Sequence, residues 1–146
     1  HGLLLSDGAS GAWLGLGLVR HTLEVLDGLA SSSSATDALL AYTRCHNSAE
    51  LTALCLDAKP AFFAQFAPLI FNHCNTDIGS LLITRATEYV SRYITHLQHL
   101  GYSRVCLMGG VADALTPWLD EHTKHTLVAA SSPPEKGAIA LMRQQP

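Results

Sequence analysis

The chain has 146 residues, enough for one domain. Hydrophobic residues make up 48% of it and charged residues only 14%; about 25% charged residues is usual in globular domains. This composition excludes intrinsic disorder, which requires low hydrophobicity and high charge. The net charge is −3 and the nine Lys and Arg residues are scattered. We therefore expect no nucleic-acid partner, because neutralising phosphates needs clustered cations.

The apolar surplus is large for a free-standing domain and predicts buried interfaces or a missing part of the fold. No apolar run approaches the roughly 18 residues of a membrane span. His1 does not open a signal peptide, so we expect a cytoplasmic protein with no membrane partner. The chain also lacks an initiator Met, which indicates a processed or truncated protein. The cysteines form no C-x-x-C pair and are expected to be buried and free: Cys45, Cys55, Cys74 and Cys106.

The first predicted element is a strand end at residues 3–5, followed by a glycine-rich turn over residues 6–11. A helix is predicted from Ala12 to Asp27, because its apolar residues gather on one face. Gly28 then supplies the left-handed residue that ends it.

Short helices are predicted in the middle of the chain. The serine-rich residues 29–35 are expected to form a loop, after which Thr36 can cap the next helix. Residues 48–56 favour a helix that Lys59-Pro60 interrupts, since the residue before proline avoids the helical region. Pro60 itself can open a further helix at its first position.

The clearest element is a helix from Asp77 to His99, ended by Gly101. Apolar and aromatic residues recur three or four positions apart over about six turns, which is the spacing of a helical seam. The seam consists of Ile78, Leu82, Ala86, Tyr89, Tyr93, Leu97 and Leu100.

The pattern changes after Gly101. Residues 104–108 predict a buried parallel strand, and Gly109-Gly110-Val111 a tight turn. The remaining predictions are a helix over 116–124, a strand over 125–130 and a closing helix over 135–143. This alternation indicates an α/β fold that is helix-rich with few strands. Two strands make a poor sheet alone, which again suggests that part of the fold is missing.

Two segments are candidate binding sites. Ligands gather at the carboxyl ends of strands in α/β folds, and Gly109 and Gly110 would let a nucleotide approach the backbone closely. The alternative is an ordinary strand-to-helix turn. In the other segment, Asp7 can accept hydrogen bonds from the hydroxyl groups of a small polar ligand; the alternative is that Asp7 or Ser10 merely caps the helix that follows.

Histidines give no metal site. The chain has eight, and two pairs are three residues apart on predicted helices: His96 with His99, and His122 with His125. No Asp, Glu or Cys stands at motif spacing to supply a third ligand, so we predict no metal held by these residues. His96 and His99 are expected on the solvated side of a helix end.

Four motifs in order carry a resemblance to a known family. Residues 10–15, Ser-Gly-Ala-Trp-Leu-Gly, resemble the G-D-E-G-S-G-A-W-[IL]-G segment of bacterial N-acetylglucosamine and glucosamine kinases. Residues 66–70 resemble a "FAPLV" stretch, and Asp77 opens the long helix where these kinases often have Gly-Asp. Residues 106–111 and 134–138 resemble an "L-x-GGV … P-x-x-GA" ending. These kinases belong to the BadF/BadG/BcrA/BcrD ATPase group of the actin–hexokinase–Hsp70 superfamily.

The resemblance implies that residues 1–146 are the C-terminal domain of a two-domain, actin-like (ribonuclease H-like) sugar kinase. Such a kinase transfers phosphate from ATP to N-acetylglucosamine or glucosamine. Asp7 matches an aspartate that contacts sugar hydroxyls, and Gly109, Gly110 and Val111 match the turn beside the adenosine. Mg²⁺ and the catalytic base belong mainly to the N-terminal half, so this chain alone is expected to be inactive. A homodimer is a reasonable expectation from the apolar surplus.

The sequence also departs from the family pattern. Gly-Asp-Glu-Gly becomes Ser6-Asp7-Gly8-Ala9, Thr76 replaces the glycine before the helix aspartate, and Glu135 replaces the usual valine. The altered loop keeps two alternatives open. One is an activator ATPase of the BadF type, which drives electron transfer in a partner enzyme. The other is a non-catalytic regulatory domain that binds sugar or nucleotide.

Overall fold

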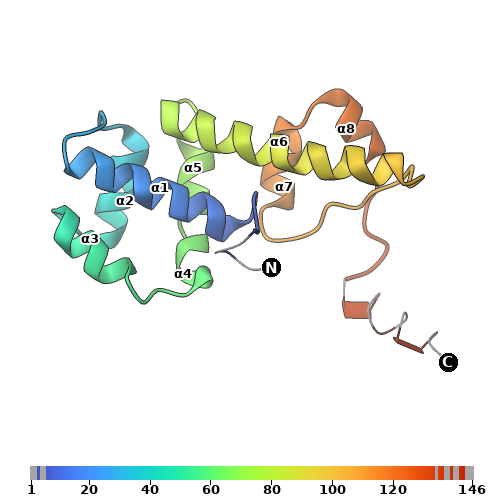
Figure 1. The fold of residues 1–146 in the computed structure, drawn as a ribbon, viewed down its shortest axis with the longest axis horizontal. Helices are drawn as coiled ribbons and strands as arrows, with labels where there is room; N and C mark the ends of the chain where they lie inside the picture. Colours follow the sequence, from blue (N-terminus) through green and yellow to red (C-terminus); the bar gives the residue numbers. More distant parts are fainter. Residues whose placement is uncertain (1–2, 4–5, 134, 137–138, 140–141, 144–146) are drawn as a thin grey trace.

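The structure is a computed structural model, and it describes all residues except 1–2, 4–5, 134, 137–138, 140–141 and 144–146 (Figure 1). Helices dominate the described part. They are α1 (Gly11–Leu26), α2 (Ser34–Thr43), α3 (Ser48–Cys55), α4 (Pro60–Ala64), α5 (Ala67–Asn72), α6 (Asp77–His99), α7 (Ala112–Leu115), the 3-10 helix η1 (Thr116–Trp118) and α8 (Glu121–Thr126). Among the described residues, none of these helices combines the length and apolar character needed to cross a membrane.

Helix α1 contacts α2, α3, α4, α5 and α6, and it forms the centre of the helical region (Figure 1). Its amphipathic pattern explains this position, because Leu14 and Leu18 are fully buried while Arg20 is exposed. A Cβ on Gly15 would collide with the carbonyl oxygen of Phe63, so this glycine lets α4 approach α1 closely. The predicted bounds of the helix are confirmed to within one residue.

Capping side chains fix the starts of α2 and α3. The Ser33 Oγ accepts a hydrogen bond from the Thr36 backbone N–H at 3.4 Å, and the Thr36 hydroxyl accepts one from the Ser33 N–H at 2.8 Å. The prediction that Thr36 is the cap was therefore wrong: Ser33 is the cap and Thr36 is the reciprocal partner. Asn47 caps α3, and Pro60 opens α4 as predicted.

Helix α6 has the predicted bounds, and Thr76 caps it through its Oγ1, which accepts from the Gly79 N–H at 3.1 Å. The predicted seam is correct only in its first half. Tyr93 is 56% exposed, whereas the buried line continues through Val90 and Ile94. Helices α7 and α8 cover that neighbouring line, which spacing along one helix cannot indicate.

The C-terminal region does not form the predicted strands. In the described residues, segments 104–108 and 125–130 share one isolated parallel bridge between Val105 and Leu127. The Val105 N–H donates to the Thr126 carbonyl at 3.1 Å, and the Val128 N–H donates to the Val105 carbonyl at 2.9 Å. A pair of extended segments without further neighbours gains too few ladder bonds to make a sheet.

The helix predicted over 116–124 is also interrupted. Leu119 is extended (φ −71°, ψ 152°), and Asp120 caps α8 by accepting from the Thr123 N–H at 2.8 Å. Of the predicted closing helix, Glu135, Lys136, Ile139, Met142 and Arg143 have helical backbone. The rest of that segment lies outside the described residues, as do Leu4 and Leu5 of the predicted first strand.

The cysteines are free, as predicted, but only Cys45 is buried. Cys55, Cys74 and Cys106 are half-buried, so the prediction of burial was wrong for them. Partial burial raises the pKa of the Cys55 thiol, because desolvation disfavours the thiolate.

Candidate functional site

The loop of residues 6–10 turns sharply into α1. Asp7 and Ala9 have left-handed backbone angles, with φ values of 71° and 67°. The Ser10 N–H donates to the Asp7 carbonyl at 3.0 Å, and the Ser10 Oγ accepts from the Trp13 N–H at 3.1 Å. Ser10 therefore caps α1, and the exposed Asp7 carboxylate is not the helix cap. Aspartate is among the residues that tolerate the left-handed region best.

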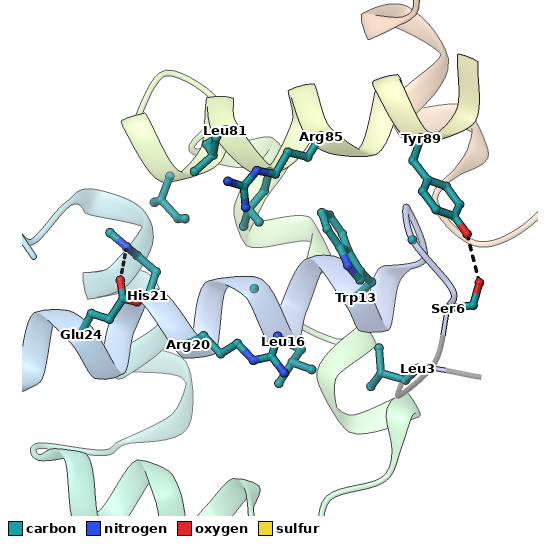
Figure 2. Close-up of a pocket in the computed structure, with 14 residues that line it drawn as sticks. Leu3, Ser6, Trp13, Leu16, Arg20, His21, Glu24, Leu81, Arg85 and Tyr89 are labelled. Atoms are coloured by element: carbon teal, nitrogen blue, oxygen red, sulfur yellow. Dashed lines mark hydrogen bonds and ion pairs between the residues drawn. The ribbon is translucent and has the colours of Figure 1, made fainter. Parts of the chain in front are cut away.

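Tyr89 of α6 holds this loop in place (Figure 2). Its hydroxyl lies 3.1 Å from the Ser6 Oγ and donates to the Tyr93 hydroxyl at 3.2 Å. A Cβ on Gly8 would lie 2.6 Å from the Tyr89 ring, so the ring packs directly on the Gly8 backbone. The hydrogen bond with Ser6 lowers the pKa of Tyr89, and the one from Tyr89 raises the pKa of Tyr93. The loop that presents Asp7 is thus fastened to the long helix.

The turn at Gly109–Val111 presents open backbone. Gly109 has a φ of 128°, which an L side chain rarely adopts. The Ala112 N–H donates to the Gly109 carbonyl at 3.1 Å and closes the turn. Nothing lies within 4 Å of a Cβ built on Gly109 or Gly110, so a ligand could reach the main chain there.

The fold brings this turn to the start of α1. A Cβ on Gly11 would lie 3.4 Å from the Val111 Cγ1. A cavity of about 310 Å³ lies between the two segments, and it is lined by Ser10, Gly11, Ala12, Pro60, Ala61, Ala64, Gly110 and Val111. The predicted sugar loop therefore runs, through Ser10, into the same hollow as the predicted nucleotide turn.

A further hollow of about 510 Å³ opens beyond Gly109. Its lining comes from the Leu107–Gly109 segment, from Ala112, Asp113 and Thr116, and from residues 127–130. Gly109 and Gly110 thus separate two cavities, one toward α1 and one toward the C-terminal segment. This arrangement suits a ligand that crosses a glycine turn.

The site residues that the sequence did not identify are Ser6 and Tyr89. The sequence pattern placed Tyr89 in the helical seam of residues 77–99, and nothing in the spacing along α6 points to the loop. The signal is three-dimensional: Gly8 is the residue that leaves room for the ring. Ser10, by contrast, was named in the sequence as an alternative helix cap, and that interpretation is confirmed.

Metal-ligating side chains do not assemble within the described residues, where no group of three or more His, Cys, Asp or Glu residues could hold an ion. His125 instead contacts the Glu121 carbonyl through its Nδ1 at 2.6 Å. His96 and His99 are exposed in the last turn of α6, as expected.

The chain is similar to proteins named as amino-sugar kinases, of which two are described here. The chain is 28% identical over 137 residues to a glucosamine kinase of Vibrio cholerae, a match that covers 92% of this chain and 46% of that protein. It matches the crystal structure of a Chromobacterium violaceum protein, provisionally named an N-acetylglucosamine kinase, with a TM-score of 0.84 and 33% identity. That match covers 93% of this chain and 48% of the other.

A scan against protein-family models found no match. The chain spans about half the length of each relative it matches. At 33% identity and this TM-score, the helix-rich fold is that of the corresponding half of the Chromobacterium protein. The resemblance seen in the sequence is thereby confirmed: the chain is homologous, over nearly its whole length, to about half of a kinase of the glucosamine and N-acetylglucosamine type.

Proposed function

We propose that the whole protein phosphorylates an amino sugar, N-acetylglucosamine or glucosamine, with ATP. In this proposal residues 1–146 are the C-terminal domain of a two-domain, actin-like kinase and form one wall of its cleft. One observation carries the proposal most directly. The cavity of about 310 Å³ joins the Ser10–Ala12 segment to Gly110 and Val111, in a chain similar to two proteins named as amino-sugar kinases.

Asp7 is assigned to the sugar. Its side chain is exposed in the loop of residues 6–10. Hydrogen bonds from sugar hydroxyls to an ionised carboxylate are stronger than hydrogen bonds between two neutral groups. Tyr89 and Ser6 keep this loop in one conformation, which reduces the entropy lost when a sugar binds.

Gly109, Gly110 and Val111 are assigned to the nucleotide. The open space at both glycines and the hollow beyond Gly109 fit the adenosine end of ATP. The reaction transfers the γ-phosphoryl group, at the opposite end of ATP. As the family resemblance implies, we assign Mg²⁺ and the catalytic base mainly to a part of the kinase outside this chain. This chain would orient both substrates and exclude water from the cleft without supplying the base.

The test measures binding and turnover separately by isothermal titration and an ATP-coupled assay. We expect the 146-residue chain to bind N-acetylglucosamine or glucosamine, and ADP, without sugar-dependent ATP turnover. Asp7→Asn should weaken sugar binding roughly tenfold or more, because a hydrogen bond to a charged group is worth about 1.5–3 kcal/mol. Asp37→Asn, at another exposed aspartate on α2, is the matched control and should leave sugar binding unchanged.

The nucleotide assignment is tested by a second variant and its matched control. Gly109→Val and Gly28→Val both place a side chain at a positive φ with nothing within 4 Å, so both add backbone strain without a steric clash. Only the change at Gly109 should weaken ADP binding. Equal effects of the two substitutions would contradict the nucleotide assignment, and ADP binding without sugar binding would favour the activator ATPase alternative. Sugar-dependent ATP turnover by the 146-residue chain would contradict the assignment of the catalytic base to a part of the kinase outside this chain.

A further inference from the structure

A cleft of about 690 Å³ runs between α1 and α6 (Figure 2). Its size is within the range of roughly 300–1,000 Å³ that is usual for small-molecule sites. Ser6, Gly8 and Tyr89 line one end, and His21 and Glu24 line the other. The proposed kinase function uses none of the side chains in the middle of this cleft.

The floor of the cleft is closed and apolar. A Cβ on Gly17 would lie 2.6 Å from the Leu82 Cδ2, so the two helices touch at this point. Leu82 and Ile78 are buried beneath it. A ligand in the cleft therefore rests on side chains instead of passing between the helices.

The walls of the cleft present apolar side chains against which a ring can lie. Trp13 extends from α1 toward α6 and is half-buried (Figure 2). Leu81, on the facing side of α6, is 44% exposed and Leu16 is half-buried. Indole and leucine surfaces of this kind favour the flat, weakly polar face of a ring.

The charge in the cleft is positive, although the chain as a whole carries −3. Arg20 of α1 and Arg85 of α6 line it from opposite helices, and both are exposed. Neither guanidinium forms an ion pair within the described part of the chain. Glu24, the acidic residue of the lining, lies 3.4 Å from the His21 Nδ1. The two arginines are thus left for an external anion.

We infer that this cleft binds a phosphomonoester that carries a ring, of the size of a sugar phosphate or a nucleoside monophosphate. Guanidinium groups match the tetrahedral phosphate through paired hydrogen bonds, and Arg85 is placed to supply them from α6, the helix toward which Trp13 extends, while Arg20 adds positive charge at the other edge of the cleft (Figure 2). The ring then lies against Trp13 and Leu81. The inference does not depend on the proposed kinase function, because Asp7 and Gly109–Val111, the residues assigned there to the substrates, do not line this cleft.

Tryptophan fluorescence provides a local reporter. The chain has two tryptophans, and Trp118 lies on η1 and is 47% exposed. A Trp118→Phe protein leaves Trp13 as its single indole. We expect glucose 6-phosphate or AMP to change the Trp13 emission with a saturable titration, and whichever binds more tightly identifies the source of the phosphomonoester. Glucose without phosphate and inorganic phosphate alone should each bind at least about tenfold more weakly.

Variants in the same background test the arginines. Arg85→Gln should weaken binding roughly tenfold to a hundredfold, since it removes charged hydrogen bonds. Arg20→Gln should weaken it less, because Arg20 contributes only positive charge at the far edge of the cleft. Arg92→Gln is the matched control, because Arg92 is exposed on the same helix as Arg85 and does not line the cleft. Asp7→Asn should leave this titration unchanged, which separates the cleft from the candidate sugar site. No saturable change with either phosphomonoester, or equal losses in the Arg85 and Arg92 variants, would overturn the inference; circular dichroism confirms that each variant is folded.

Discussion

The two ends of this chain respond differently to the same physical requirement, that buried backbone groups be hydrogen-bonded. Around α1, the helices form most of their backbone hydrogen bonds internally, and Leu14, Leu18, Leu39 and Phe66 are fully buried. In the C-terminal region, segments 104–108 and 125–130 share a single bridge, and Val105 and Leu127 are only half-buried. A helix satisfies its backbone locally, whereas a strand depends on neighbouring strands. The stability of this chain should therefore be concentrated around α1.

The largest expected difference in stability between the two regions comes from truncating one leucine in each. Leu18→Ala removes a fully buried side chain from the centre of α1 and should lower the free energy of unfolding by about 2–5 kcal/mol. Leu127→Ala removes a half-buried leucine beside the isolated bridge and should cost well under half of that. Urea unfolding followed by circular dichroism at 222 nm measures both. A larger loss for the Leu127 variant would show that the C-terminal region supports the helical core.

The same contrast explains which features the sequence could predict. The bounds of α6 follow from Thr76, the amphipathic repeat and Gly101, all local signals that the helix itself uses. The exposure of Tyr93 and the burial of Val90 could not be predicted, because they depend on where α7 and α8 pack. The strand predicted over 104–108 forms only a single bridge, from Val105 to Leu127, in the described structure.

The candidate site shows the same division. Ser10 as a cap and the open Gly109–Gly110 turn could be anticipated from residue type, since serine caps and glycine permits a positive φ. The meeting of Gly11 with Val111 joins residues one hundred positions apart in the numbering. Likewise, the contact between Gly8 and Tyr89 appears only once α6 is packed beside the loop. Spacing along the sequence also gives no sign that Arg20 and Arg85 line the same cleft.

A smaller effect is expected at the start of α2, where the side chain to be removed is a helix cap and not a buried core residue. Ser33→Ala removes the Oγ that accepts from the Thr36 N–H, and it should lower the free energy of unfolding by about 0.5–2 kcal/mol. Ser32→Ala changes an exposed neighbour outside the capping box and should stay within about 0.5 kcal/mol of the parent. Thermal unfolding at pH 7 compares the two. Equal losses would mean that the serine-rich loop, and not the cap, fixes this end of α2.

The smallest expected effect concerns Asp120, whose hydrogen bond with Ser91 joins the C-terminal region to α6. Its carboxylate accepts from the Thr123 hydroxyl at 2.6 Å, the Thr123 N–H at 2.8 Å and the Ser91 hydroxyl at 3.2 Å. These bonds, with those from Thr123 the largest cause, lower the pKa of Asp120 to about 2 from its usual 3.8. Because the folded-state pKa is the lower one, the stabilisation is complete above about pH 4 and is lost as the pH falls toward 2.

Asp120→Asn keeps a good capping side chain but cannot titrate, so it isolates this contribution. We expect the difference in melting temperature between parent and variant to be constant from pH 7 to about pH 5. The difference should then shrink between pH 4 and pH 2, as the parent alone loses its ionised cap. Asp113→Asn, at an exposed aspartate of α7 without such bonds among those described, should run parallel to the parent over the whole range. If the Asp120 difference is also independent of pH, the hydrogen bonds to Thr123 and Ser91 do not link the C-terminal region to α6 in solution, and the stability of that region must come from the packing of Leu115 and Leu119 alone.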